Sequence, residues 1–436
     1  MTTPAKRILL LVCVWQTAFS LLVGAELRVG VASRVVTPDP LLPVSGGVGP
    51  SHPVSRKQGD LEVRALVLAE GDTRVAIVSA DFLGFPSQLG NKARAQVKDI
   101  PPQNILIGAS HTHSAPDCYG FPDSKGAFAT DLKYLESVCA KMAEAINEAL
   151  SHQQPAYLKI ATAEAKGKIA YNYYAEQLYD PRCHVIQVIS TDNKPIATLV
   201  NYAIHPEVIG SGQGILSPDL VGPLRERIQE KGGGFAIFMN SAQGGMVTAD
   251  NRAGGGKENR TWEECGRIGA LLADEALRIV DKAPVQKSPK LFCAARTISF
   301  PVESPLLQAV MKSSPLGYSP SPLNGERAGV RCETNTMRVS TQLNVVNIGN
   351  AQILTIPGEA LPNIGYYLKR KMRGEHNLLF GLTNDPFGYI LSKVDWGSFK
   401  RYNYVSRTCL GEMTGEILIE EGLKFVNACP VPEKLQ

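Results

Sequence analysis

Several short β-branched segments of this chain end at a polar cluster instead of an ordinary turn, and this pattern limits the folds that the chain can adopt. The predicted strands and the residues that follow them are 74–80 before Asp81, 104–108 before His111, 197–204 before His205, 235–238 before Asn240, 352–356 before Glu359, and 377–381 before Asn384. Groups at the carboxyl ends of strands in α/β proteins line a common crevice. The pattern therefore predicts an α/β protein with one site assembled from distant parts of the chain.

Amphipathic helices are predicted between and after these strands, because apolar residues recur there at helical spacing. They cover residues 127–150, 219–231, 260–282, 359–372 and 408–426. A segment rich in Pro, Gly and Ser at 304–331 is predicted as a long surface loop. Helices that alternate with strands cover the faces of a sheet, so we expect a single large α/β domain.

The N-terminus has the features of an export signal. Lys6 and Arg7 precede an apolar run over 8–23, which ends in small residues of the kind that signal peptidase prefers. We expect residues 1–25 to be removed, so that the mature protein begins near Glu26 and is secreted or periplasmic. The alternative is an uncleaved N-terminal anchor. No later segment reaches the roughly 20 consecutive apolar residues of a membrane span.

Composition and missing motifs exclude several functional classes. The formal net charge is +4 over 436 residues, without a basic tract, so the chain lacks the charge pattern of a nucleic-acid-binding protein. It contains no Gly-x-Ser-x-Gly, no phosphate-binding loop and no His-Glu-x-x-His, which argues against common serine esterases and zincin proteases. Eight of the nine cysteines follow the leader and none forms a CxxC pair, so a cysteine-rich zinc site is excluded.

The few histidines are concentrated at predicted strand ends. His111 and His113 lie in a Ser-His-Thr-His-Ser motif, and in extended backbone a spacing of two places both imidazoles on the same side. Both could then address one ion or substrate, although His-x-His also has structural uses. His205 ends another apolar strand and is fixed by Pro206 behind it; alone, it is equally compatible with a hydrogen-bonded core histidine.

Glu359 follows a Pro-Gly turn and is predicted in the first turn of the next helix. There, free backbone N–H groups and the helix dipole would stabilise its carboxylate by about 0.3–1 kcal/mol, which is a purely structural role. Catalytic zinc, however, normally takes three nitrogen or carboxylate ligands and keeps one position open. Two histidines and Glu359 would satisfy that requirement.

Four motifs stand in a fixed order along the chain. They are His111-Thr-His113-Ser-Ala-Pro, Ala203-Ile-His205-Pro, Ile356-Pro-Gly-Glu359, and Gly388-Tyr389 with Arg401-Tyr402 downstream. In this order they resemble the catalytic domain of the neutral, non-lysosomal ceramidase family, over residues 27–425. The resemblance implies one domain over 26–436 with two β-sheets sandwiched between helices in four layers, α/β/β/α, and without the C-terminal immunoglobulin-like domain of the ceramidases.

The resemblance also implies roles for individual residues. It implies one Zn²⁺ ion, whose ligands are His111, His205, Glu359 and Tyr389. His113 would face the substrate carbonyl, and Tyr402 would donate a hydrogen bond to the oxyanion that develops there. Tyr404 is close enough in sequence to compete with Tyr402, and both tyrosines are also compatible with half-buried loop positions.

The chain departs from the family at two functional positions. The position of the family's nucleophilic serine falls on Thr248, whose β-branch restricts χ1 and crowds the approach to the hydroxyl. Attack would come from Thr248 or from water activated by the metal, and a structural role for Thr248 stays open. The family's substrate-binding arginine falls on Tyr173, and Arg64 and Arg182 are candidate substitutes.

These features together predict an exported zinc-dependent hydrolase of amides. The expected substrate is a small-molecule or lipid amide, such as an N-acyl sphingoid or another acylated amine. Peripheral contact with membrane lipid is a further expectation. The alternatives are a zinc-dependent esterase or non-lipid amidase of the same fold, and a non-catalytic exported binding protein with a structural metal.

Overall fold

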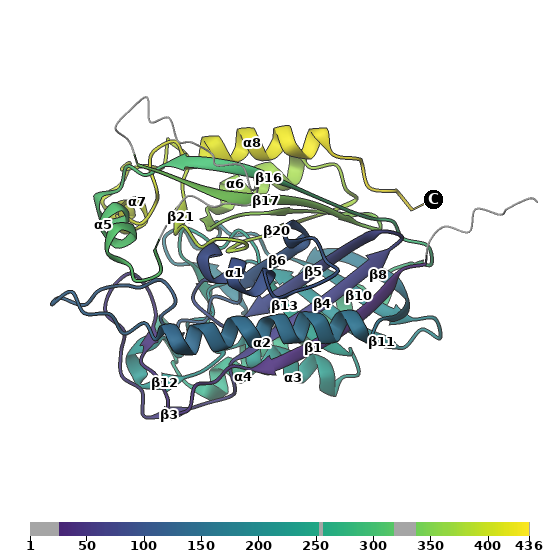
Figure 1. Ribbon diagram of the computed structural model, residues 1–436, viewed down its shortest axis with the longest axis horizontal. Helices are drawn as coiled ribbons and strands as arrows, with labels where there is room; N and C mark the ends of the chain where they lie inside the picture. Colours follow the sequence, from purple (N-terminus) through teal and green to yellow (C-terminus); the bar gives the residue numbers. More distant parts are fainter. Residues whose placement is uncertain (1–25, 253–255, 318–336, 436) are drawn as a thin grey trace, which may run out of the picture.

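The structure is a computed structural model that describes residues 26–252, 256–317 and 337–435 (Figure 1). The predicted signal peptide, residues 1–25, and the part of the Pro-rich segment beyond residue 317 lie outside these ranges. In the described ranges, no helix is long and apolar enough to cross a membrane.

A large mixed sheet forms the centre of the fold. In the described chain it has nine strands, in the order β13-β11-β10-β8-β1-β4-β5-β6, with β15 paired to β8. The bounds are β1 Arg28–Val35, β4 Glu62–Glu70, β5 Thr73–Ala80, β6 Ile105–Ala109, β8 Gln154–Glu164, β10 Arg182–Ser190, β11 Pro195–Tyr202, β13 Phe235–Asn240 and β15 Val285–Gln286. Most neighbours are antiparallel, but β5 and β6 are parallel, as are β11 and β13.

The large sheet curls so that strands from its two ends contact each other. Arg64 on β4 donates from Nε to the Ala236 carbonyl of β13 (2.7 Å), and the Ser79 hydroxyl on β5 donates to the Phe238 carbonyl (2.6 Å). Carbonyls of an edge strand that turn into the interior need partners, and these side chains provide them. The curl therefore brings the end of β6 close to the ends of β11 and β13.

A smaller sheet packs on the inner face of the large one. Its strands are β16 Leu291–Pro301, β17 Arg338–Ile348, β18 Ala351–Thr355 and β20 His376–Phe380, paired in that order. One buried cluster joins the two sheets and includes Leu66, Ile77 and Leu199 of the large sheet with Ile353 and Phe380 of the small one. The near-continuous apolar sequence of these strands follows from their burial on both faces.

Helices cover both outer faces, which completes four layers (Figure 1). The large sheet carries α1 Ser87–Arg94, α2 Leu132–Ser151, α3 Val221–Glu230 and α4 Trp262–Asp281, whereas the small sheet carries α6 Pro362–Lys371 and α8 Thr414–Ala428. Two of the helices begin at side-chain caps, since Asp131 accepts from the Tyr134 N–H and Thr261 from the Glu264 N–H. The predicted arrangement of two sheets between helices is confirmed.

Short elements complete the chain. They are β2 Val44–Ser45, β3 Arg56–Lys57, β7 Ala115–Pro116, β9 Ala170–Asn172, β12 Ile215–Leu216, β14 Val247–Ala249, β19 Glu359–Ala360, β21 Tyr389–Ile390, α5 Pro305–Ser313, α7 Asn403–Arg407, and the 3₁₀ turns η1 Pro102–Asn104, η2 Ser211–Gln213 and η4 Lys400–Tyr402. Helices α5 and α7 lie beside each other at one end of the molecule (Figure 1).

The structure corrects two predicted elements. The loop expected from residue 304 begins with α5, because the Ser304 hydroxyl caps the helix and Pro305 fits its first position, where no N–H is needed. The helix expected from residue 359 begins at Pro362, and Glu359 lies in β19, paired with β21. The prediction that a helix N-terminus stabilises the Glu359 carboxylate is therefore wrong.

Two other features bear on earlier expectations. The described cysteines, which include Cys409 and Cys429, are free thiols and most are buried. Asp81, which was expected at the common site, instead forms a fully buried ion pair with Arg225 Nη1 at 2.8 Å.

Removal of one partner from this buried pair is expected to destabilise the fold. In Asp81→Ala the buried Arg225 guanidinium loses its close carboxylate and keeps only Glu62, at 3.9 Å, which should lower the free energy of unfolding by about 3–5 kcal/mol. The matched control is Arg227→Ala. Arg227 lies on α3, as Arg225 does, but its partner Asp274 has an exposed side chain, so the loss of this pair should cost at most about 1 kcal/mol. Denaturant unfolding of both variants checks this, and equal losses would contradict it.

Candidate metal centre and pocket

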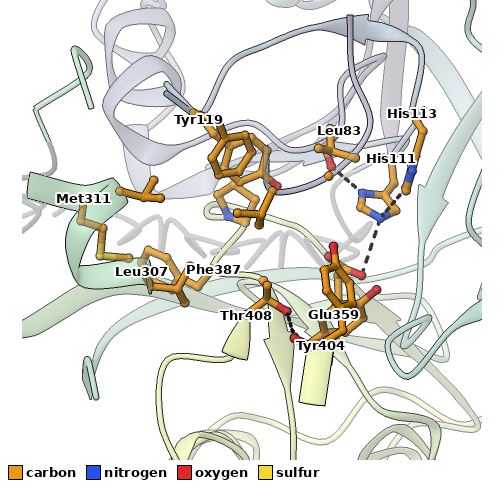
Figure 2. Close-up of a pocket in the computed structure, with 17 residues that line it drawn as sticks. Leu83, His111, His113, Tyr119, Leu307, Met311, Glu359, Phe387, Tyr404 and Thr408 are labelled. Atoms are coloured by element: carbon orange, nitrogen blue, oxygen red, sulfur yellow. Dashed lines mark hydrogen bonds and ion pairs between the residues drawn. The ribbon is translucent and has the colours of Figure 1, made fainter. Parts of the chain in front are cut away.

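Residues from both sheets meet at one buried point. His111 follows β6, His205 follows β11, and Glu359 lies in β19 just beyond β18. His205 Nε2 is 3.1 Å from Glu359 Oε2. His111 Nε2 is 3.6 Å from the same oxygen (Figure 2). His113 Nε2 is 3.3 Å from His111 Nε2, and ring nitrogens of the three histidines lie within 4.8 Å of one another. The strand ends thus bring together three imidazoles and one carboxylate.

Backbone carbonyls orient two of these imidazoles. Nδ1 of His111 lies 2.5 Å from the Leu83 carbonyl oxygen, and Nδ1 of His205 lies 2.8 Å from the Val247 carbonyl oxygen. A carbonyl only accepts, so each Nδ1 carries a proton, and Nε2 of the neutral His111 presents a lone pair to the centre. Nε2 of His205 instead faces the Glu359 carboxylate, to which it donates when it is protonated. Metal-binding histidines are oriented by the same kind of hydrogen bond.

The protonation states also suit a cation. Burial lowers the pKa of His111 to about 3 and that of His113 to about 3, so both imidazoles are neutral near pH 7. Burial opposes a charge on His205, but the hydrogen bond and charge of Glu359 outweigh it and raise its pKa. Burial likewise opposes ionisation of Glu359, yet His111 and His205 lower its pKa, so the carboxylate is charged.

The spacing of these atoms fits a metal polyhedron. Zinc–nitrogen bonds of about 2.0–2.1 Å in a tetrahedral site place ligand atoms roughly 3.3 Å apart. Glu359 Oε2 lies 3.1 Å from Nε2 of His205 and 3.6 Å from Nε2 of His111, and both separations are close to that value. Neutral imidazoles with a carboxylate are donors that first-row divalent metals accept readily. The residues present therefore fit a divalent metal ion.

The backbone at His111 differs from the expectation. The spacing argument assumed an extended chain, but His111 has a φ of 72°, in the left-handed region that non-glycine residues rarely adopt. Its imidazole nevertheless lies close to that of His113, with ring centroids 4.8 Å apart and nearly perpendicular planes. Backbone strain of this kind gathers at functional sites, where surrounding contacts maintain it.

Asn240 is a positioning residue. The sequence analysis placed it near the site but assigned it no role. Its Nδ2 donates to the carbonyl of Ser110 (3.3 Å) and to the carbonyl of Ile204 (2.7 Å). These residues directly precede His111 and His205. One buried amide at the end of β13 thus ties the two histidine loops together.

Glu207 was missed by the sequence analysis, although it follows the His205-Pro206 motif directly. Its Oε2 lies 3.6 Å from Nδ1 of His113 and its side chain is 25% exposed. Burial keeps His113 neutral, so this contact is not a charged pair in the structure. The signal that could have identified it is an acidic residue two positions after a candidate ligand.

Tyr389 is placed beside Glu359 by the parallel pairing of β19 and β21. Gly388 precedes it with a φ of 78°, and a Cβ there would lie 2.2 Å from the Thr408 carbonyl oxygen, so the Gly-Tyr motif needs its glycine. The Tyr389 hydroxyl lies 3.4 Å from Met246 Sδ. Burial raises its pKa well above 10, so the phenol is neutral before any metal binds.

The two competing tyrosines lie in different surroundings. Tyr404 lines the pocket in front of the histidines, and its ring lies 6.0 Å from that of Tyr389 (Figure 2). Tyr402 packs instead against Tyr174 and Phe399, at 5.5 and 5.6 Å between ring centroids, and is not among the described residues that line the pocket. Burial raises the pKa of Tyr404 to about 12, so its hydroxyl keeps its proton.

An apolar pocket leads away from the histidines. It has His111, His113 and Glu359 at one end and aromatic and aliphatic side chains at the other (Figure 2). The apolar walls include Tyr119, Phe121, Leu307, Val310, Met311 and Phe387. Three of these come from α5, the helix found where a loop was expected. The pocket can therefore hold a hydrocarbon group next to the polar centre.

Thr248 lies next to His205 in the structure. The two residues form an isolated parallel β-bridge, so their backbones are adjacent. Val247 and Ala249 on either side are buried in the core beneath α3 and α4, so the Thr248 side chain points to the opposite face of β14 and is half-exposed. Its hydroxyl makes no hydrogen bond with the described residues.

The two candidate arginines lie away from the pocket lining. Arg64 is buried against β13 and pairs with Glu62 at 2.5 Å. Arg182 binds Asp180 through Nε and Nη2, both at 2.8 Å. Neither is placed to contact a group in the pocket, and each is explained by its structural partners.

Solved structures share this architecture. A neutral ceramidase from Pseudomonas aeruginosa superposes with a TM-score of 0.71, covering 94% of this chain and 76% of that one at 15% identity. The chain has the neutral ceramidase fold. A structure described as a ceramidase complexed with C2 gives a TM-score of 0.70 over 94% of this chain and 77% of that one, at 16% identity. No family model and no curated protein matches the sequence. At this identity the neutral ceramidase likeness establishes the fold, and the chemistry rests on the residues above.

Metal content should depend on the converging side chains. His205→Ala and Glu359→Gln each remove a donor, so we expect metal stoichiometry to fall from about one per chain to less than about 0.2. The control is His152→Ala, an exposed histidine at the end of α2. Elemental analysis after gel filtration measures this. Full metal retention in the first two variants would exclude the centre.

Proposed function

We propose that this chain is an exported, zinc-dependent hydrolase of lipid amides, with N-acyl sphingoids as the leading substrate class. The observation that supports it most is the convergence of His111, His205 and Glu359, of which His111 and Glu359 line one end of an apolar pocket. A hydrocarbon group in the pocket would place an attached carbonyl at the polar centre. Export rests on the N-terminal leader, and the ceramidase neighbours favour an amide bond.

His111, His205 and Glu359 would hold zinc, with Tyr389 beside Glu359 as the further ligand. When bound, the ion polarises a carbonyl and lowers the pKa of water. The protein supplies the dry surroundings: the walls from α5 and Phe387 exclude water, which strengthens every electrostatic contact within the pocket.

His113 would contact the substrate carbonyl. Its Nε2 lies 3.3 Å from Nε2 of His111 and faces the same centre, so an N–H there would donate to the carbonyl oxygen. His113→Ala should therefore retain metal and lose turnover, in contrast to His205→Ala.

Tyr404 is better placed than Tyr402 to donate to the oxyanion. The phenol lines the pocket and stays protonated, whereas Tyr402 packs in an aromatic group outside it. Tyr404→Phe removes the donor and little else, so we expect kcat to fall by about 10²–10³. Tyr402→Phe is the matched control and should stay within about threefold of wild type. A larger loss of kcat in Tyr402→Phe than in Tyr404→Phe would assign the hydrogen bond to Tyr402 instead.

The nucleophile is Thr248 or water, and one variant distinguishes them. If the Thr248 hydroxyl attacks, Thr248→Ala should lose at least about 100-fold in kcat/KM, which is about 2.7 kcal/mol. Activity within a few-fold of wild type would leave water as the nucleophile. Thr248→Ser should keep or raise the activity in the first case, since it retains the hydroxyl without the methyl group.

The substrate class is tested with zinc-loaded protein and three probes: a fluorescent N-acyl sphingosine, a non-lipid amide, and an ester of the same acyl chain. We expect the lipid amide to be cleaved with the highest kcat/KM and His111→Ala to be at least about 100-fold slower. Preferential ester cleavage would make the protein an esterase. Zinc binding without turnover of any probe would support a binding protein with a structural metal.

A further inference from the structure

The three most exposed large hydrophobic residues of the described chain are Val394 (70%), Phe399 (62%) and Tyr173 (54%). They belong to one surface, because ring contacts run from Phe399 to Tyr402 (5.6 Å), from Tyr402 to Tyr174 (5.5 Å) and from Tyr174 to Tyr173 (5.9 Å). Val394 is in the same loop as Phe399, where its carbonyl accepts from the Ser398 hydroxyl. We refer to Tyr173, Tyr174, Val394, Phe399 and Tyr402 as the aromatic rim.

Basic side chains flank the aromatic rim without acidic partners. Lys393, Lys400, Arg401 and Arg407 are all exposed, and within the described residues none forms an ion pair. Arg401 instead donates to the Tyr174 carbonyl and lies over its ring. Asp395, the acidic residue in this segment, is held by the Ser392 hydroxyl and the Asn363 amide. The Glu416 carboxylate also lies nearby, since it accepts from the backbone N–H of Lys393. The rim therefore combines exposed apolar groups with four basic side chains that form no ion pair in the described chain.

The rim is continuous with the mouth of the pocket. Tyr404 and Thr408 line both the inner pocket and an outer hollow that also includes Arg407 and Leu306. Tyr174 and Tyr402 pack on the cluster that contains Tyr389. A molecule that enters the pocket thus passes between the basic side of the rim and α5.

The chemistry of this surface favours a lipid bilayer over a protein partner. Exposed Phe and Val insert into the acyl boundary, tyrosine rings occupy the headgroup level, and lysine and arginine contact anionic phosphates. The core of a protein interface, in contrast, is depleted in lysine. Since no described helix spans a membrane, contact of this kind would be peripheral.

We propose that the aromatic rim and its four basic residues dock the protein on bilayers that contain anionic phospholipids, with the pocket mouth facing the lipid–water interface. The inference goes beyond the proposed reaction. It gives an amphiphilic substrate a direct route from the bilayer to the pocket. Its test needs neither metal nor turnover, so its failure is distinguishable from failure of the proposed hydrolase.

The test is sedimentation of the purified mature protein with vesicles of phosphatidylcholine alone or with 30% phosphatidylglycerol. We expect at least about tenfold stronger partitioning onto the anionic vesicles, reduced by salt, because each basic residue near the surface contributes about fivefold. Val394→Ser/Phe399→Ser and Lys393→Glu/Lys400→Glu should each weaken it at least about tenfold. Both double variants should cleave a soluble short-chain amide at the wild-type rate.

The control is Val285→Ser/Lys282→Glu, an exposed apolar and basic pair after α4 that lies outside the rim. It should partition like wild type. The proposal is overturned if wild type ignores anionic vesicles, or if the rim variants bind them as well as the control does. Vesicle binding by wild type without cleavage of any amide would count against the proposed hydrolase alone.

Discussion

The curl of the large sheet determines where the chemistry can occur. Strands β4 and β5 reach β13 through the Arg64 guanidinium and the Ser79 hydroxyl, which satisfy carbonyls that a flat sheet would leave at its edge. The Asn240 amide continues this contact at the strand ends, where it joins the loops before His111 and His205. Without this closure the two histidines would lie at separate edges of an open sheet. The small sheet then contributes Glu359 from the opposite layer.

Polar residues after the strands divide into two groups. Some face the pocket and remain available to a ligand, whereas others form hydrogen bonds or ion pairs with groups of the protein. Asp385 belongs to the second group, because it accepts from the Ser87 N–H (2.8 Å) beneath α1, and Asn384 accepts from Arg94 (2.7 Å). Asp81 is likewise committed to Arg225. A buried carboxylate that already has a cationic or amide partner is a poor candidate for binding anything else.

The sequence was sufficient for the architecture, and it named three side chains that the structure brings together: His111, His205 and Glu359. Helical and strand periodicity identified the elements because both sheets are buried on two faces, and the order of four motifs identified the two-sheet fold that the solved structures share. Local composition failed at α5, where Ser304 and Pro305 suggested a loop but in fact begin a helix. It also failed at Glu359, because a two-residue parallel pairing with Tyr389 depends on residues about thirty positions away. The sequence pattern also could not predict the direction of individual side chains. Tyr402 and Tyr404 are two residues apart, and only their packing in the structure distinguishes them.

The division of the candidate ligands between the two sheets affects how the site can form. Synthesis proceeds from the N-terminus, so every strand that carries a histidine of the cluster precedes the small sheet in time. A nascent chain that has completed β13 can already gather the three imidazoles, but the carboxylate that balances a dication does not yet exist. The centre is complete only after β18 has docked and β19 has paired with β21. Assembly of the donor set is therefore a late event in folding, and a chain interrupted before residue 359 would present histidines without the anion that completes them.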